Sequence, residues 1–311
     1  MLVALAGAVG LLLLYYGAEF LVKGGSSIAI KMKIPPLVIG LTLVAYATSA
    51  PELVVSMDAA IKGMGDISLG NVAGSNICNI ALILGLCAII TPMQVNKQLL
   101  KLDIWIMIAS AVLLGVFYWT LHGVNRIAGA FLLLSSIAYT VWSIYAARRN
   151  AQSDSNSEIP AKTYSLTFAI LLTLAGLAAL VGGAKLFVYA AVALARYCNI
   201  SDAVIGLTVV AVGTSLPELA TSVVAAIRKE QDIAIGNVIG SNIFNVLAIL
   251  GIAPLIKPIK AIGISVVDIA LMIVLSMLLA VFMRSGFKIS RREGVIMLAV
   301  YIAYTAYLIV K

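Results

Sequence analysis

The chain has 311 residues, of which 62% are hydrophobic and 11% are charged. Soluble globular proteins carry about 25% charged residues, so this composition excludes a water-soluble enzyme domain. The formal net charge of +8 comes from 21 Lys and Arg against 13 Asp and Glu. Because these cations lie mostly between long apolar segments, they indicate membrane topology and not a nucleic-acid partner.

Apolar segments long enough to cross a bilayer follow one another along the whole chain. A spanning helix requires about 20 apolar residues. The sequence therefore predicts an all-α, polytopic membrane protein with ten transmembrane helices. They are expected at residues 2–30, 37–61, 67–91, 102–121, 126–147, 164–195, 203–227, 233–256, 264–283 and 293–310. The first segment has no basic residues before its apolar run, so we expect a helix and not a cleaved signal.

One polar, Ser-rich stretch, RRNAQSDSNSEIPAK at 148–162, divides the chain into two halves. It predicts a linker between a first unit, 1–147, and a second unit, 163–311. When the loop Lys and Arg are assigned to alternating sides of the membrane, thirteen fall on one side and six on the other. The positive-inside rule makes the richer side, with the linker, cytoplasmic. We therefore expect a multi-pass protein of the cell membrane with both termini extracellular.

The two halves contain an internal repeat. A shift of 166 residues aligns 38–85 with 204–251 without a gap, and 29 of the 48 positions are identical. With five helices in each copy, an odd number, the second copy crosses the membrane in the opposite sense. The sequence thus predicts two inverted five-helix repeats, an architecture of secondary transporters whose substrate site lies where the halves meet.

Glu52 and Glu218 are equivalent under this shift, and each lies near the middle of its predicted span. A charged residue at that depth costs about 3 kcal/mol even on lenient insertion scales, and it is usually functional. Each Glu follows a proline, Pro51 or Pro217, which lacks an N–H and frees backbone carbonyls where it breaks the helix. Hydroxyl oxygens lie at the same two breaks, on Thr48, Ser49, Thr214 and Ser215.

A second duplicated motif reads GNVAGSNICN at 70–79 and GNVIGSNIFN at 236–245, and we expect it to open the third and eighth helices. Ser75 and Asn79 are four residues apart, as are Ser241 and Asn245, so each pair shares a helical face. The other asparagines of the motif have two open interpretations, because a membrane Asn can be a ligand or a packing contact between helices. They are Asn71, Asn76, Asn237 and Asn242.

The duplicated motifs offer oxygen atoms only, with no His or Met at matching positions. Oxygen ligands favour a hard cation, and Ca²⁺ accepts six to eight of them. Two carboxylates neutralise one divalent ion, or they could host two or more Na⁺ or two protons. A low-dielectric cavity cannot hold both loads at once, which is a physical basis for exchange. The three cysteines, Cys78, Cys87 and Cys198, are expected to be small core residues without a disulfide or metal role.

At these motifs the sequence resembles the calcium:cation antiporter superfamily, and in particular the prokaryotic sodium/calcium exchangers. The resemblance implies that two glutamates bridge Ca²⁺, that surrounding oxygens form Na⁺ sites, and that the long helices 2–30 and 164–195 slide across the core. Some members carry an acid at the position of Asn245. Its absence here leaves two carboxylates and resembles the potassium-independent members more than the potassium-dependent ones. The implied cation ligands are Glu52, Thr48, Ser49, the Ala45 carbonyl, Ser75 and Asn79, with Glu218, Thr214, Ser215, the Ala211 carbonyl, Ser241 and Asn245.

We therefore expect an antiporter that exchanges Na⁺ for Ca²⁺ by alternating access, working as a monomer in membrane lipid without a cofactor. Exchange of H⁺ for Ca²⁺ or another divalent cation is the alternative, and a passive cation channel is another. An enzyme is disfavoured because no nucleophile or metal-ligand motif accompanies the two acids. Glu19 and Lys185 occupy matching repeat positions on the sliding helices. Glu19 is expected to pair with Lys23 as a structural or gating charge.

Overall fold

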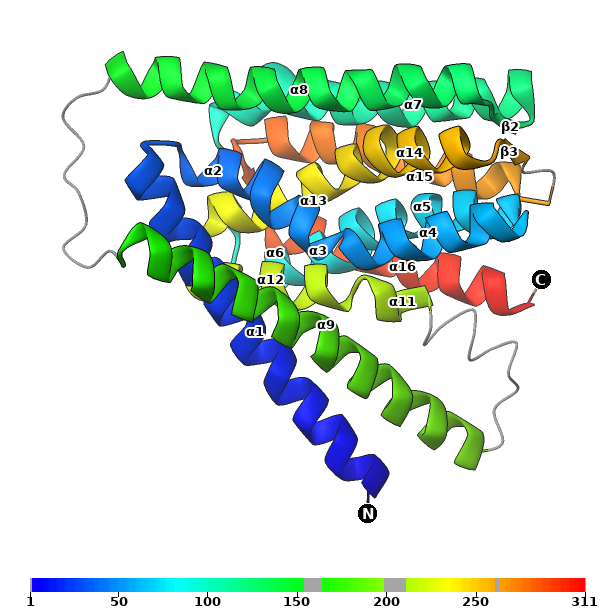
Figure 1. Ribbon diagram of the computed structural model, residues 1–311, viewed down its shortest axis with the longest axis horizontal. Coiled ribbons are helices and arrows are strands. Elements are labelled where there is room, and N and C mark those ends of the chain that lie inside the picture. The colour runs from blue at the N-terminus through cyan, green and yellow to red at the C-terminus, as the bar shows by residue number, and fades with distance from the viewer. Residues whose placement is uncertain (1, 154–163, 199–210, 261–262, 311) are drawn as a thin grey trace.

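The computed structural model describes residues 2–153, 164–198, 211–260 and 263–310, which form long helices joined by short connections (Figure 1). The first half contains α1 (Leu2–Met32), α2 (Pro36–Ile39), η1 (Gly40–Val44), α3 (Ala45–Thr48), α4 (Ala50–Lys62), α5 (Gly65–Ile77), η2 (Cys78–Leu84), α6 (Gly85–Ile90), η3 (Leu99–Asp103), α7 (Ile104–Leu121) and α8 (Arg126–Ser153). The second contains α9 (Leu166–Tyr197), α11 (Ala211–Thr214), α12 (Leu216–Ile227), α13 (Gln231–Phe244), η5 (Asn245–Ile249), α14 (Leu250–Ile256), α15 (Val266–Arg284) and α16 (Arg291–Val310). Segments labelled η are π-helical.

Eight helical segments of the described chain are long and apolar enough to cross a membrane, and the bent pair Pro36–Thr48 and Ala50–Lys62 makes a ninth. This confirms the predicted all-α, polytopic membrane architecture. The predicted span 203–227 begins outside the described residues, and its described part contains α11 and α12. The predicted linker, 148–162, also lies mostly outside them, and α8 continues to Ser153.

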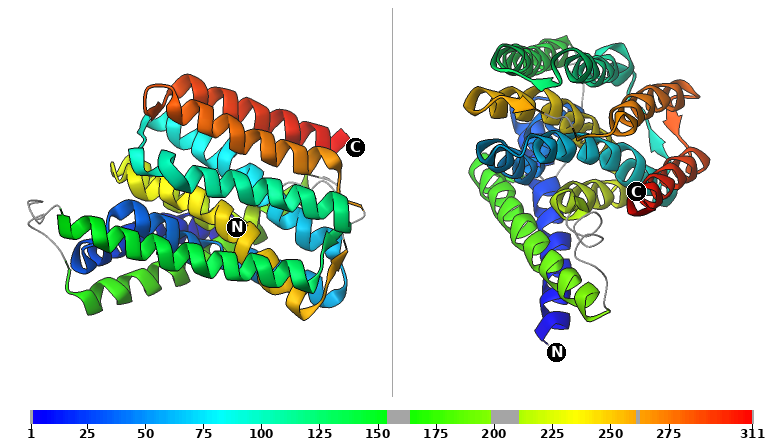
Figure 2. Two further views of the ribbon diagram at one scale, coloured as in Figure 1. Left: turned by 90° about the horizontal axis from the view of Figure 1, so that it is seen from above. Right: turned by 90° about the vertical axis from the view of Figure 1, so that its right-hand side faces the viewer.

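Helices α1 and α9 form an outer pair that runs antiparallel and projects obliquely from the other helices (Figure 1; Figure 2, right). Small residues allow the two backbones to approach closely. A Cβ added at Gly17 would lie 2.8 Å from Leu180 N and 2.9 Å from Gly176 O. A Cβ added at Gly10 would lie 2.8 Å from Phe187 N. No larger side chain fits at these positions without moving a helix.

The continuous segments α5–α6 and α13–α14 occupy the centre of the molecule. In an apolar 18-residue window of each segment, 72% of residues are buried for Gly65–Ile90 and 83% for Gln231–Ile256, but only 11% for Arg291–Val310. Helix α13 packs closely on the start of the second span, since a Cβ added at Gly40 would lie 2.8 Å from Ile233 O. The duplicated GN motifs therefore lie in the best-enclosed helices. They do not open these helices as expected, because α5 begins five residues before Gly70.

Short antiparallel strands connect the two halves of the chain. Strand β1 (Met93–Gln94) pairs with β4 (Lys288–Ile289), and β2 (Gly123–Val124) pairs with β3 (Ile259–Lys260). Each pair joins one strand of the first half to one of the second.

A tyrosine contact also recurs in both halves. Tyr139 donates to Asp103 Oδ1 at 2.9 Å, and Tyr304 donates to Asp268 Oδ1 at 3.0 Å. Each contact joins two residues 36 positions apart. The same link between helices is thus made twice.

The outer faces of the bundle carry large apolar side chains. Leu134 on α8 is 66% exposed and Ile302 on α16 is 61% exposed, as expected for surfaces that face lipid. Cys78 and Cys87 are buried, but Cys198 is exposed at the end of α9. The prediction that all three cysteines are core residues is wrong for Cys198, because this residue follows the end of α9 at Tyr197, on the exposed outer pair.

Candidate functional site

Two helix breaks position the duplicated carboxylates. Ser49 separates α3 from α4 with φ −82° and ψ 8°, and the segments before and after it meet at 47°. Ser215 separates α11 from α12 with φ −87° and ψ 8°. The prolines stand at the starts of α4 and α12, where a missing N–H costs nothing. The predicted breaks are confirmed, and they put Glu52 and Glu218 in the first turn of a helix, where its dipole favours negative charge.

The two breaks meet and exchange hydrogen bonds. Ser49 Oγ donates to Glu218 Oε1 at 2.7 Å. Ser215 Oγ donates to Glu52 Oε1 at 3.0 Å. All four side chains are buried. Each carboxylate is therefore held by a hydroxyl from the other half of the chain, and the two acids lie at the boundary between the halves.

Several buried oxygens of the two acids and of the duplicated GN motifs have no hydrogen-bond partner among the described residues. They are Glu52 Oε2, Glu218 Oε2, Asn79 Oδ1, Asn245 Oδ1 and Ser241 Oγ. A buried polar atom without a partner costs about 1–3 kcal/mol, and more when it is charged. Within the described ranges no group of three or more His, Cys, Asp or Glu side chains is placed to hold a metal. Two carboxylates with neutral oxygens are instead the ligand chemistry of a hard cation.

The remaining predicted residues lie around this centre. Ser75 Oγ lies 3.5 Å from Ser215 Oγ. Thr48 Oγ1 donates to Asn237 Oδ1 at 3.1 Å. The Ala45 carbonyl accepts the Ser49 N–H at 3.0 Å. At the second break, Ala211 and Thr214 are the first and last residues of α11.

The asparagines left open by the sequence support the helix breaks and the central helices. Asn71 Nδ2 donates to the Glu52 carbonyl at 3.2 Å and to Ser56 Oγ at 3.0 Å. Asn237 Nδ2 donates to Ser222 Oγ at 2.9 Å. The segment η2 begins one residue before Asn79, and η5 begins at Asn245. Such π-helical turns often occur at functional sites.

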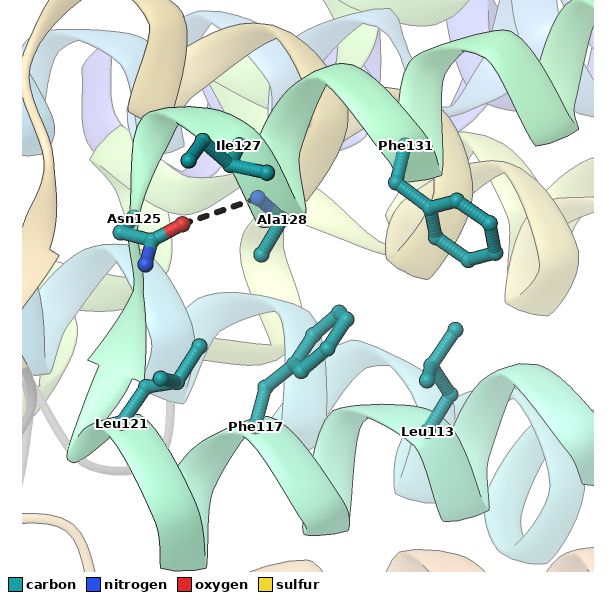
Figure 3. Close-up of a pocket in the computed structure, with 7 residues that line it drawn as sticks. All are labelled: Leu113, Phe117, Leu121, Asn125, Ile127, Ala128 and Phe131. Carbon is teal, nitrogen blue, oxygen red and sulfur yellow. Dashed lines mark hydrogen bonds between the residues drawn. The ribbon is translucent and has the colours of Figure 1, made fainter.

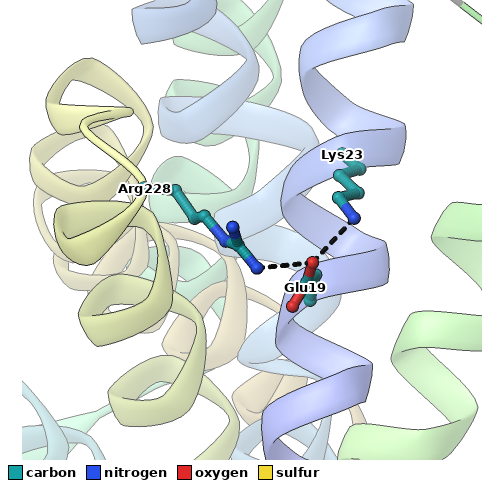
Figure 4. Close-up of polar contacts among 3 residues, drawn as sticks. All are labelled: Glu19, Lys23 and Arg228. Carbon is teal, nitrogen blue, oxygen red and sulfur yellow. Dashed lines mark hydrogen bonds and ion pairs between the residues drawn. The ribbon is translucent and has the colours of Figure 1, made fainter.

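A charged contact outside this centre ties α1 to the end of α12 (Figure 4). Lys23 Nζ and Arg228 Nη2 each lie 2.7 Å from Glu19 Oε1. The predicted Glu19–Lys23 pair is confirmed. The Arg228 contact was missed because no local pattern connects residues 209 positions apart.

The hollow between α7 and α8 is a different kind of surface (Figure 3). Its lining is apolar except for Asn125, whose Oδ1 accepts the Ala128 N–H at 2.9 Å to cap α8. None of its described lining residues is charged, so these residues offer no carboxylate to a cation. The polar centre, and not this hollow, is the candidate functional site.

The geometry agrees with the comparisons to known proteins. The family described as "sodium/calcium exchanger protein" matches this chain over residues 2–145 and 168–310. Over an alignment of 335 positions, the chain is 38% identical to sodium/calcium exchanger MaX1 of Methanosarcina acetivorans, and the alignment covers 95% of both chains. It is 37% identical over 257 residues to inner membrane protein YrbG of Escherichia coli, covering 80% of this chain and 78% of that protein.

A solved structure shares the fold of the whole chain. It is the sodium-calcium exchanger NCX_Mj soaked with zero Na⁺ and Ca²⁺, with a TM-score of 0.86, 38% identity and 99% of both chains covered. Matches of this extent, in sequence and in structure, show more than a common architecture. The chain belongs to the sodium/calcium exchanger protein family.

Proposed function

We propose that this protein is a secondary antiporter that exchanges Na⁺ for Ca²⁺ across the cell membrane by alternating access. The observation that carries this proposal is the pair of buried glutamates, Glu52 and Glu218, each held by a serine of the other half and each with one oxygen left without a donor among the described residues. Two negative charges balance one Ca²⁺. Family membership and the named relatives support the same exchange.

The proposed cation ligands are the twelve residues expected from the sequence. Glu52 and Glu218 would bridge Ca²⁺, and the neighbouring oxygens would share the Na⁺ load. Ser241, Asn79 and Asn245 have buried oxygens that no donor of the described chain satisfies, which supports their inclusion. The Ala45 carbonyl accepts the Ser49 N–H at 3.0 Å and the Thr48 hydroxyl at 3.3 Å, so it would bind a cation in place of the longer Thr48 bond. Occupancy by Ca²⁺ and by Na⁺ would exclude one another because their combined charge exceeds that of two carboxylates.

The proposal includes ten spans in two inverted five-helix repeats, 1–147 and 163–311, joined by a cytoplasmic linker at 148–162, with extracellular termini. The 166-residue repeat, the strand pairs that join the halves and the recurring Tyr–Asp contact support it. The chain would work as a monomer, because both halves of the site come from one chain. The close contact of α1 and α9 supports their movement as one body.

The counter-ion is tested by Ca²⁺ uptake into liposomes that contain the purified protein. Liposomes loaded with Na⁺, K⁺ or choline are diluted into ⁴⁵Ca²⁺ medium, with and without an imposed proton gradient, and protein-free liposomes serve as the control. We expect uptake only from Na⁺-loaded vesicles. Uptake driven by protons in the absence of Na⁺ would replace Na⁺ by H⁺ as the counter-ion. Uptake in choline-loaded vesicles without any gradient would indicate a channel and contradict exchange.

A further inference from the structure

Four buried asparagines form a reciprocal contact across the two halves. Asn79 Nδ2 donates to Asn242 Oδ1 at 3.1 Å. Asn245 Nδ2 donates to Asn76 Oδ1 at 3.1 Å. Asn79 and Asn245 are equivalent under the 166-residue shift, and so are Asn76 and Asn242. Each half of the chain thus supplies the acceptor for the amide nitrogen of the other half's candidate ligand.

The chemistry of the amide makes this contact important. A carboxamide has one acceptor oxygen and one NH₂ donor group of nearly the same shape, so a rotation of 180° exchanges them. Only the oxygen can bind a cation, whereas the NH₂ group would repel it. In both contacts the NH₂ group is bonded to the partner asparagine, and the oxygen is left buried without a donor among the described residues.

The two acceptor asparagines are themselves oriented by groups that can only accept. Asn76 Nδ2 donates to the backbone carbonyl of Asn242 at 3.2 Å, so its Oδ1 must face the other way, toward Asn245. Asn242 Nδ2 lies 3.6 Å from the Met107 sulfur, a weak acceptor, and its Oδ1 faces Asn79. A carbonyl and a thioether have no proton to donate. The orientation of the Asn79 and Asn245 amides is therefore set by neighbouring asparagines that are not themselves candidate ligands.

We propose that Asn76 and Asn242 are positioning residues that aim the amide oxygens of Asn245 and Asn79 at the transported cation. This inference rests on the proposed function, because it assumes that the cation binds at this centre. It explains why the motif repeats Asn at a spacing of three, as N-I-C-N and N-I-F-N. The first Asn orients a ligand of the other half, and the second is a ligand.

The test is a double-mutant cycle on Ca²⁺ binding. Asn242→Leu keeps the size of the side chain but removes the acceptor, so the Asn79 amide is free to turn its NH₂ group toward the cation. We expect Ca²⁺ affinity to fall by about 10-fold. In the Asn79→Asp background both terminal atoms of the side chain at position 79 are oxygens, so a rotation of this side chain no longer changes which atom faces the cation. In that background Asn242→Leu should change Ca²⁺ affinity less than about 2-fold, because either carboxylate oxygen at position 79 can face the cation. The remaining small change comes from the loss of the Asn242 oxygen that would face the carboxylate.

Binding is measured by isothermal titration of CaCl₂ into purified protein, with folding checked by size-exclusion chromatography and the unfolding temperature. The mirror cycle, Asn76→Leu with and without Asn245→Asp, supplies the result if Asn242→Leu does not fold. An equal loss in both backgrounds would show that the asparagines only pack helices together and would overturn the positioning role alone. Wild-type protein that binds no Ca²⁺ would overturn the proposed function and this inference together.

Discussion

The central polar site and the outer helices α1 and α9 differ in how far the two halves of the chain match one another. In the centre the contacts come in matched sets, because Ser49 holds Glu218 as Ser215 holds Glu52. At the periphery they do not. Glu19 of α1 binds Arg228 after α12, but the equivalent positions in the other half are Lys185 and Lys62, which are both cationic. The candidate ligands are thus duplicated, whereas the charged residues on the outer helices have diverged between the two halves.

This difference has a mechanical interpretation under the proposed function. A carrier needs the same ligands whichever side of the membrane it faces, so the centre tolerates little asymmetry. The outer helices need only close contact between small residues, and their charges set which arrangement is favoured. Glu19–Arg228 stabilises the arrangement seen here, whereas Lys185 and Lys62 would repel one another in its mirror image. We therefore expect changes in the centre to abolish binding and changes at the periphery to alter rates.

The largest effect is expected from Glu52→Gln or Glu218→Gln. The amide keeps an oxygen for the serine hydroxyl but removes one of the two charges that balance Ca²⁺. Breaking a buried charge pair costs about 3–5 kcal/mol, so Na⁺-driven ⁴⁵Ca²⁺ uptake should fall by at least about 100-fold. The matched control is Asp58→Asn, an exposed acid on the same helix α4. Near-normal uptake by either Gln variant would remove that carboxylate from the proposed site.

A smaller loss is expected from Gly17→Ala on α1. The added methyl group would lie 2.8 Å from Leu180 N and 2.9 Å from Gly176 O, so α1 and α9 must separate. Overpacking of this kind costs about 1–3 kcal/mol, and the exchange rate should fall by about 10-fold. Gly182→Ala on α9 is the control, since its methyl group would meet no described atom within 4 Å. If Gly17→Ala lowers the Ca²⁺ affinity measured by calorimetry as much as it lowers the exchange rate, the outer helices affect binding as well, and the contrast between centre and periphery is wrong.

The centre was largely predictable from the sequence, and the periphery was not. Duplication identified Glu52 and Glu218, and proline chemistry located the breaks beside them. Neither rule could show that each serine binds the glutamate of the other half, because that contact depends on how the halves meet. The Glu19–Arg228 contact and the orientation of Asn76 and Asn242 depend on the same tertiary arrangement. The exposure of Cys198 was missed for a related reason, since an apolar stretch does not show whether it faces protein or lipid.

The smallest effect is expected from Arg228→Gln, and it tests whether the charge asymmetry matters. Arg228 is half exposed, and Glu19 keeps its bond to Lys23, so the exchange rate should change only about 2- to 5-fold. Lys62 is the residue equivalent to Arg228 in the first half, and Lys62→Gln breaks its exposed ion pair with Asp58. This variant should change the exchange rate less than about 2-fold.

The decisive comparison adds Glu19→Gln to Arg228→Gln. If the two residues act through their mutual contact, the double variant should have the rate of the more impaired single variant, because the second change has no contact left to remove. Rates that multiply would mean that each charge acts separately. The outer pair would then carry no coupling between α1 and α12, and its asymmetry would have no mechanical consequence.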